Sequence, residues 1–545
     1  MPAVLSRADL VAAAPVWLLE VTWAGRVFRF SSRPVDLASD DGAVTFEGGL
    51  EDPEFSLSLQ RLSTSPQGQS VSVEVHFPVD VAKERRHGFD LGAATAELSM
   101  VLEKWGTIQQ TWEDRFRLMA GRVINPQWGD PTRGSGWAAF TVEEQAYDDA
   151  SRLMGNAPTV SFDTWTAPHL DHLGKAYPQI IGSPGAYIDP SDGSAETVRG
   201  SPAYIVEYTT IFAGNEADKL VIAGHPVHAT AVTVIDGDDA EETFPIAHEQ
   251  DDQGRLVTTV TVTGASTIDL TDAEFWIAWH SGGGLASPFQ PSASLRGAGD
   301  VCRWALSHSS VPVDHGRWAA AAAFLNRFKI DTYINDIDAT PWEWLSDHVL
   351  PLLPITIQRG PDGLYPVVMD LAAGVNDATA VTAGPDFLRV GPVTAEKPRA
   401  DVVNHYTFDY AKDGSTGDHF RRARLESDHD TTDPQAISNW YVKVSKDRYG
   451  ELRATDDSDV VFDDATAVSV MEWRSRVEGF IPSTVPYDAD TSWGWVTLGQ
   501  IIAITDDDLF WTDQLATVIE KAWNGVGWSF TLLIDDDLAR DSHST

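Results

Sequence analysis

Along the first 160 residues, apolar and polar positions alternate in short runs, a pattern that predicts β-strands. The clearest run places Val71, Val73, Val75 and Phe77 on one side of a strand, with polar residues between them facing the other side. A helix is predicted over residues 93–105. Further strands are predicted at residues 17–23, 26–30, 55–59, 115–124 and 137–142.

Turn-forming residues separate this sheet-rich part from a second β-rich segment. Ser183-Pro184-Gly185 and the acidic run at 189–194 are dense in Pro, Gly, Asp and Ser, the residues that tight turns favour. The segment 200–290 has three consecutive glycines near its end, at 282–284, and is predicted to be an insertion. Its predicted strands lie at residues 219–223, 230–235 and 256–262.

One helix start in the third part is unusually clear. Thr340 is the predicted N-cap, Pro341 the first helical residue and Glu343 the third, which together form a capping box. Pro351 and Pro354 are expected to end the helix. Helices are also predicted at 299–307 and 316–330, and strands at 355–358 and 364–369.

The last part of the chain repeats a short pattern from the first. Val123-Ile124 precedes a loop and then Trp137 and Phe140-Thr141-Val142, while Val518-Ile519 precedes a loop and then Trp528 and Phe530-Thr531-Leu532. The spacing after the tryptophan differs by one residue, so a true repeat and a chance similarity of two hairpins both fit. A helix is predicted at 464–473, and strands at 499–505, 514–521 and 528–534.

The charge of the chain limits its partners. Its 81 acidic and 39 basic residues give a formal net charge of −42, which argues against binding nucleic acid through phosphate neutralisation. An acidic surface suited to salty surroundings and a channel wall that repels DNA both fit this charge. The 43% hydrophobic content, with 20 Trp and 22 Phe, predicts a folded protein.

Disulfide bonds and membrane spans are not expected. Cys302 is the single cysteine, so the chain can form no internal disulfide. Arg7, Asp9 and Pro15 interrupt the region where a signal peptide would lie. The chain contains no run of about 18 apolar residues that would predict a membrane-spanning helix.

Several residue groups contain side chains typical of catalytic or binding sites, but none has a convincing pattern. Cys302 with His308, Asp314 and His315 lacks the sequence signature of a cysteine or serine hydrolase. We therefore predict no catalytic residues, no cofactor and no metal site. The other groups weighed were His169, Asp171 and His172 as well as His225 and His228 for metal, Asp506–Asp508 and Asp535–Asp537 for calcium, and Trp342 with Trp344 and Trp493 with Trp495 for sugar stacking.

Taken in order, a series of short motifs resembles the baseplate hub (tail tip) proteins of long-tailed bacteriophages and gene transfer agents. No single motif is diagnostic, and the resemblance rests on their order over nearly the whole chain. The motifs are Phe46-Glu47-Gly48-Gly49-Leu50, Arg122-Val123-Ile124-Asn125-Pro126, Tyr177-Pro178-Gln179-Ile180-Ile181-Gly182, Val313-Asp314-His315-Gly316-Arg317-Trp318, Thr340-Pro341-Trp342-Glu343-Trp344-Leu345, Leu350-Pro351-Leu352-Leu353-Pro354, residues 404–410, residues 445–450 and Leu498-Gly499-Gln500-Ile501-Ile502.

The resemblance implies a β-rich multidomain (α+β) fold with two tube-like β domains. The first tube-like hub domain with a connecting segment would span 1–182 and the second 395–545. A β-rich insertion at 183–292 and a mixed α/β domain at 293–394 would lie between them. Some gene transfer agent relatives hold an iron–sulfur cluster through several cysteines, but this chain has only Cys302, so that site is not expected.

The resemblance also implies a structural, non-enzymatic role at the distal end of a phage tail tube. A homotrimer would adapt the sixfold tube to a threefold tip and line the DNA exit channel. Its partners would be a distal tail protein or tube ring above and a central fibre or tip protein below, with viral DNA passing through the lumen without specific binding. The expected location is the virion tail tip, after assembly in the host cytoplasm.

Two other functions remain open at this stage. The chain could be a host-surface carbohydrate-binding tail module, with the insertion at 200–290 carrying the affinity. It could also be a tail-associated hydrolase that opens the cell wall, which would depend on His308 and His315.

Overall fold

The computed structural model describes residues 13–59, 70–78, 91–130, 132, 134–144, 150–155, 158–189, 193–207, 217–263, 266–269, 274–280, 282–290, 293–369, 378–426 and 436–535. The chain is rich in β-structure, as its alternating patterns predict. It divides into two compact units, each built from segments far apart in sequence. One unit contains residues 1–148, 355–398 and 481–545, and the other contains 149–354 and 399–480.

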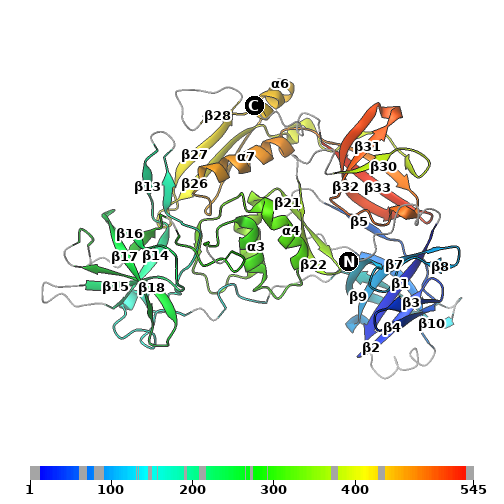
Figure 1. Ribbon diagram of the computed structural model, residues 1–545, viewed down its shortest axis with the longest axis horizontal. Coiled ribbons are helices and arrows are strands. Elements are labelled where there is room, and N and C mark those ends of the chain that lie inside the picture. The colour runs from blue at the N-terminus through cyan, green and yellow to red at the C-terminus, as the bar shows by residue number, and fades with distance from the viewer. Residues whose placement is uncertain are drawn as a thin grey trace. The chain divides into compact units, whose positions relative to one another are not determined.

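The first unit holds two large sheets, one drawn mainly in blue and the other mainly in orange-red in Figure 1. The N-terminal sheet has the order β3-β4-β2-β1-β7-β9-β10-β6, with β8 paired to β7. Its strands are β1 (Ala14–Trp23), β2 (Arg26–Ser31), β3 (Val35–Ser39), β4 (Gly42–Gly48), β6 (Ser70–His76), β7 (Thr95–Lys104), β8 (Thr107–Ile108), β9 (Phe116–Asp130) and β10 (Gly134–Glu143).

The second sheet of this unit has the order β23-β31-β32-β33-β30-β24, with β25 paired to β30 and β5 to β32. A separate hairpin, β21 (Ile355–Gly360) with β22 (Gly363–Val368), belongs to the same unit. The strands of the second sheet are β5 (Ser56–Ser58), β23 (Thr379–Thr382), β24 (Phe387–Arg389), β25 (Thr394–Ala395), β30 (Ser483–Ala489), β31 (Ile501–Asp506), β32 (Trp511–Trp523) and β33 (Trp528–Ile534).

The alternation predicted for β6 is confirmed, but the helix predicted over 93–105 is wrong. That segment is β7, which lies between β1 and β9. Its Leu, Met, Ala, Glu and Lys residues favour helices intrinsically, yet Ala96, Leu98, Met100 and Leu102 also recur with a period of two and all enter the core. Pairing on both sides of β7 therefore overrides the local preference.

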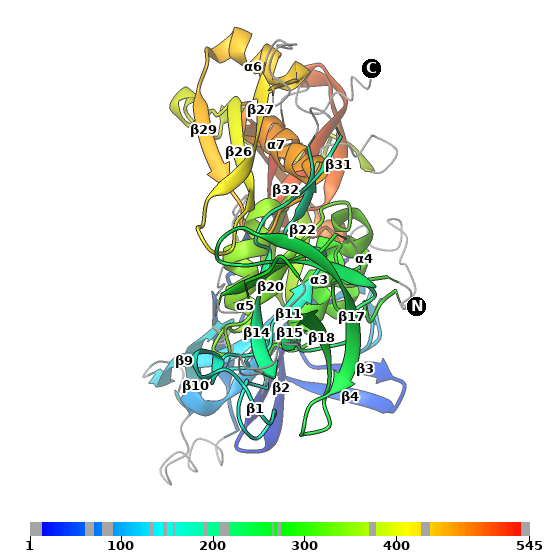
Figure 2. The same cartoon turned by 90° about the vertical axis from the view of Figure 1, so that its left-hand side faces the viewer.

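The second unit contains a closed barrel of order β14-β15-β18-β17-β16-β19, seen in Figures 1 and 2. Apolar side chains such as Leu220, Val232 and Phe275 fill its interior. The barrel strands are β14 (Ser201–Glu207), β15 (Ala217–Ala223), β16 (Ala231–Ile235), β17 (Glu241–Gln250), β18 (Leu256–Thr263) and β19 (Phe275–Ala278).

A helical segment and a small α/β layer complete this unit. Helix α7 packs against β26 and β27 of a four-stranded sheet of order β28-β27-β26-β29, as Figure 1 shows. The remaining elements are β11 (Gln179–Ile181), β12 (Ala186–Ile188), β13 (Ala195–Thr197), α3 (Ala298–Leu306), α4 (His315–Leu325), β20 (Thr332–Ile334), α5 (Pro341–Trp344), β26 (His405–Lys412), β27 (His419–Glu426), β28 (Ala436–Ser438), α6 (Trp440–Tyr449), β29 (Arg453–Asp457) and α7 (Asp464–Glu478).

Helices α3 and α4 approach each other closely at a glycine. A Cβ atom on Gly299 would lie 2.5 Å from the Cα atom of Ala322, closer than two such atoms can approach.

The predicted helices at 299–307, 316–330 and 464–473 are confirmed as α3, α4 and α7, with ends that differ by a few residues. Local sequence patterns therefore locate the helices well.

The predicted start of α5 is also confirmed. The Thr340 hydroxyl accepts a hydrogen bond from the Glu343 amide at 3.2 Å, and Pro341 is the first helical residue. The helix continues as a π-helical turn over Leu345–Val349 and a 3₁₀ turn over Leu350–Leu352.

Loss of this cap should cost a moderate amount of stability. Replacing Thr340 with alanine leaves a helix-end amide without its partner, so we expect the free energy of unfolding to fall by about 1 kcal/mol. Urea denaturation followed by circular dichroism measures the change. Thr340→Ser keeps the hydroxyl and should unfold like the parent; equal losses in both variants would contradict a capping role.

Candidate functional site

The two sheets of the first unit contain the same four-stranded core. Strands β6, β7, β9 and β10 lie in the spatial order β7-β9-β10-β6, and all neighbours are antiparallel. Strands β30, β31, β32 and β33 lie in the order β31-β32-β33-β30, again antiparallel throughout. If the strands of each core are numbered 1 to 4 along the chain, their spatial order is 2-3-4-1 in both cores. The repeat noticed in the sequence thus extends to a whole topology.

Strand register supports this equivalence. Val142 on β10 lies opposite Val123 on β9, and Leu532 on β33 lies opposite Val518 on β32. In both hairpins the ladder shifts register within a few residues of this pair, which indicates a β-bulge in the same region of each hairpin. A chance similarity of two hairpins does not account for the shared strand order.

The structure corrects the alignment at the tryptophan. With Phe140 and Phe530 as equivalents, the residues two positions earlier are Ala138 and Trp528, and both are buried. Trp137 is half-buried and belongs to the opposite face, because neighbouring residues on a strand alternate sides. The one-residue difference in spacing therefore reflects two unrelated tryptophans.

Side chains from both sheets share one hydrophobic core. The ring of Trp17 on β1 lies 5.7 Å from that of Trp523 and 6.4 Å from that of Trp528, measured between centroids. Strand β5 from the N-terminal segment pairs with β32, and the Leu59 amide donates to the Ile519 carbonyl at 2.7 Å. The two sheets therefore form one folded body.

A buried lysine lies within this core. The Lys521 side chain is 3% exposed and donates hydrogen bonds to the carbonyl oxygens of Gly494 at 2.6 Å and Val496 at 2.8 Å. Its ammonium nitrogen lies 4.3 Å from the centre of the Trp528 ring. Burial lowers the pKa of Lys521 to about 7, because the charged form loses its hydration.

The pKa of Lys521 should make stability depend on pH. Between about pH 7 and the ordinary lysine pKa near 10.4, the folded state carries a neutral amine while the unfolded state binds a proton. Stability should therefore rise with pH across this window, by up to about 1.4 kcal/mol per pH unit. Urea denaturation at pH 7, 8 and 9 measures the slope. Lys521→Met should remove it, and an identical slope in this variant would assign the effect to other groups.

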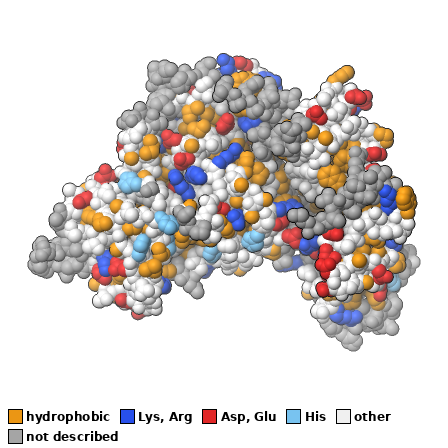
Figure 3. Space-filling view, viewed as in Figure 1, with side chains coloured by type: hydrophobic (Ala, Val, Ile, Leu, Met, Phe, Trp, Pro, Cys, Tyr) orange, Lys and Arg blue, Asp and Glu red, His pale blue; other side chains and the backbone are white. Residues whose placement is uncertain are grey.

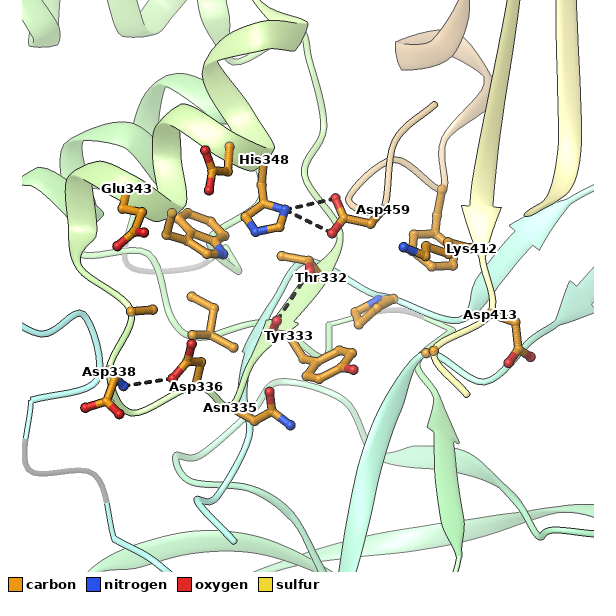
Figure 4. A pocket seen from close by; sticks show the side chains of 18 residues that line it. Thr332, Tyr333, Asn335, Asp336, Asp338, Glu343, His348, Lys412, Asp413 and Asp459 are labelled. Carbon is orange, nitrogen blue, oxygen red and sulfur yellow. Dashed lines mark hydrogen bonds and ion pairs between the residues drawn. The ribbon is translucent and has the colours of Figure 1, made fainter. Parts of the chain in front are cut away.

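The second unit contains a cavity of about 520 Å³, shown in Figure 4. His348 from the turn after α5 and Asp459 from the loop before α7 face each other there, with His348 Nδ1 2.9 Å from one carboxylate oxygen and 3.1 Å from the other. The hydrogen bond to Asp459 raises the pKa of His348. Other lining side chains are Tyr333, Asn335, Asp336, Asp338, Glu343, Trp344, Asp347, Lys412 and Asp413.

The side chains around this pair differ from those of a serine or cysteine hydrolase. The residues lining the cavity, all of them in the described part of the chain, include neither serine nor cysteine. The hydroxyl of Thr332 is directed to the carbonyl of Tyr333 at 3.4 Å. Within the cavity, the His348–Asp459 pair joins two segments of the second unit that lie far apart in sequence.

The cysteine group weighed as a nucleophile is structural. Cys302 is completely buried in α3, and burial raises the pKa of its thiol, which keeps it protonated and unreactive. His308 packs on Trp304, with ring centroids 5.2 Å apart. Asp314 caps α4 by accepting the Arg317 amide at 3.0 Å, and His315 is the first residue of that helix.

His172 and His225, from the two histidine groups considered as metal ligands, use ring nitrogens for hydrogen bonds within the fold. His172 Nδ1 accepts the Ile205 amide at 2.8 Å, and His225 Nε2 accepts the Ile180 amide at 3.0 Å. Burial lowers the pKa of His225 to about 4, so it stays neutral. Within the described ranges, no group of three or more His, Cys, Asp or Glu side chains could hold a metal ion.

The acidic and aromatic groups also have structural roles. Asp506 accepts the Tyr487 hydroxyl at 2.7 Å and the Asp508 amide at 3.0 Å. Asp535 is buried, whereas 536 and 537 lie outside the described residues. Trp493 and Trp495 stack with centroids 5.7 Å apart, but Trp493 is buried and offers no sugar platform. Trp344 is likewise buried, while Trp342 is half-buried.

One face of the surface carries side chains of several kinds. On the face shown in Figure 3, acidic side chains are interspersed with basic, apolar and neutral polar ones. None of the helices in the described ranges is both long and apolar enough to cross a membrane.

Comparison with known proteins finds similarity in structure only. No protein-family model and no curated protein matches the chain. Among solved structures, a tail protein from Neisseria meningitidis MC58 is 9% identical, with a TM-score of 0.37, and the match covers 96% of this chain and 98% of that one. The 43 kDa tail protein of prophage MuSo2 from Shewanella oneidensis is 8% identical, with a TM-score of 0.36, covering 96% and 100%.

A third similar structure comes from the virion of a native gene transfer agent particle. It is 9% identical, with a TM-score of 0.39, and the match covers 74% of this chain and 92% of that one. The descriptions of these three structures name tail proteins and a gene transfer agent virion. Their TM-scores all lie below 0.5, so they establish no function for this chain.

Proposed function

We propose that this chain is a structural virion protein that forms the trimeric baseplate hub at the distal end of a phage tail tube. The observation that carries the proposal is the repeated four-stranded core of the first unit, with the same strand order and antiparallel directions in both copies. The two copies share one hydrophobic core, so each chain contributes them as one body.

Symmetry explains why a hub would need two copies. Three chains with two equivalent cores each present six similar sheet domains, which match a sixfold ring on one side. The segments that occur once per chain, including the barrel and the α/β layer of the second unit, keep threefold symmetry. A trimer of this kind adapts a sixfold tube to a threefold tip.

The net charge of −42 suits the wall of a DNA exit channel. Acidic side chains repel phosphate, so viral DNA passes through the lumen without being held. A distal tail protein or tube ring lies above the hub in this scheme, and a central fibre or tip protein lies below. The protein assembles in the host cytoplasm, and its final location is the tail tip of the virion. Its role there is structural and not enzymatic.

Single-particle electron microscopy of the purified full-length chain, together with its mass in solution, tests this function. We expect a threefold ring of three chains with the paired sheet cores around a central channel. A closed monomer in which the two cores are not related by rotation about a channel would contradict the proposal. That outcome would favour the carbohydrate-binding alternative.

A further inference from the structure

Each copy of the four-stranded core carries one aromatic side chain at an equivalent loop. Trp105 follows β7 and precedes β9, and Phe510 follows β31 and precedes β32. These loops join the second and third strands of their cores. Trp105 is 91% exposed and Phe510 is 94% exposed, the two most exposed of the large hydrophobic residues in the described part of the chain.

Both aromatic residues also hold an unfavourable backbone conformation. Trp105 has φ 53° and Phe510 has φ 57°, in the left-handed region that bulky residues rarely adopt. Trp105 and Gly106 form a two-residue turn in which β8 folds back on β7, a position where glycine or asparagine is usual. The Lys104 ammonium lies 5.2 Å from the centre of the Trp105 ring, a weak interaction at an exposed position. Packing inside the fold therefore does not explain why an aromatic residue occupies either position.

We propose that Trp105 and Phe510 are docking residues through which the hub binds a ring-shaped protein that stacks on it and offers six equivalent apolar sockets. This inference rests on the function proposed above. A rotation about the ring axis that superposes the two cores would place both loops on the same face, so a trimer would present six aromatic tips. An exposed aromatic entering a socket is the kind of side chain that dominates binding energy at protein interfaces.

The charge around Phe510 favours a protein socket over a lipid surface. Asp507 and Asp508 belong to the 3₁₀ turn that ends just before Phe510, and the Asp508 side chain is 85% exposed. Anionic lipid headgroups repel such carboxylates. Six weak contacts made together also produce strong attachment through effective concentration, so each socket needs little affinity of its own.

The test uses the purified full-length chain and tubes assembled from the tail-tube protein of the same virus. Cosedimentation of the chain with the tubes measures binding, and mass in solution measures its trimer. We expect Trp105→Ala and Phe510→Ala each to weaken binding at least tenfold and the double variant to abolish it, with the trimer unchanged. Phe420→Ala is the matched control, because Phe420 is an aromatic of the second unit that is 54% exposed, and it should bind like the parent.

Several results would overturn the inference. The double variant could bind tubes like the parent, or the Phe420→Ala control could lose binding equally. The aromatic variants could fail to form the trimer, which would mean that Trp105 and Phe510 contact neighbouring copies of the chain. Binding to phosphatidylglycerol vesicles that depends on both aromatics, without binding to tubes, would identify a lipid surface. If the parent chain forms threefold rings that do not bind the tubes, this inference fails while the hub proposal stands. If the parent chain forms no ring, the hub proposal itself fails.

Discussion

Replacing Trp528 with alanine is expected to lower the free energy of unfolding by about 3–5 kcal/mol, the range for removing a large buried aromatic side chain. Trp528 is fully buried, and its ring centroid lies 6.1 Å from that of Phe55 and 5.3 Å from that of Trp523. Because residues of both sheets contribute to this core, the space left by the missing ring should destabilise both sheets. Urea denaturation followed by far-ultraviolet circular dichroism measures the loss.

Trp105→Ala is a matched control for this change. It removes the same atoms from a side chain that is 91% exposed, so its effect on stability should stay within about 0.5 kcal/mol. Hydrogen exchange adds a sharper readout, because amides in β1 and β33 should lose protection together in Trp528→Ala. Loss of protection in the C-terminal sheet alone would show that the two sheets do not share a core.

Replacing Asp331 with alanine should cost a similar amount, about 3–5 kcal/mol, because it breaks a buried ion pair. The Asp331 carboxylate is completely buried and accepts two hydrogen bonds from the Arg296 guanidinium, at 2.7 Å and 2.9 Å. It also accepts the Ser183 amide at 2.7 Å. Alanine would leave a partly buried guanidinium and a buried amide without their partner, which is more costly than losing the contact itself.

Asp338→Ala provides the comparison for this second prediction. The Asp338 carboxylate lies 2.9 Å from the Arg152 guanidinium, but these side chains are 70% and 56% exposed, so the pair should contribute less than about 1 kcal/mol. Thermal unfolding of both variants under the same conditions measures the difference. Equal losses would mean that the buried pair contributes no more than a solvated one.

Local patterns in the sequence predicted many elements correctly because their causes are local. The Thr340 cap is formed by residues three apart, and the alternation along β6 needs only one buried face. The helix predicted over 93–105 failed for the opposite reason. In β7, pairing with β1 and β9 outweighs the helical preference of its residues, and those strands lie elsewhere in the sequence.

The features of the candidate site also divide into those visible in the sequence and those that only folding creates. The sequence identified one repeated hairpin, but the equivalence of the four-stranded cores depends on strand pairing that no short motif contains. Lys521 appeared as an ordinary charged residue, although it is buried among carbonyl oxygens. His348 and Asp459 are 111 positions apart, so only folding brings their side chains together.

The sequence by itself determined the β-rich class, the positions of most helices and strands, and the strong negative charge that argues against nucleic-acid binding, because these follow from composition and from neighbours within a few residues. The tertiary structure alone decided that the N-terminal and C-terminal sheets share a core, that their four-stranded cores are equivalent, and that Trp105 and Phe510 lie exposed at matching loops. These features depend on which distant strands pair and on which faces become buried, and both are set by packing across the whole chain.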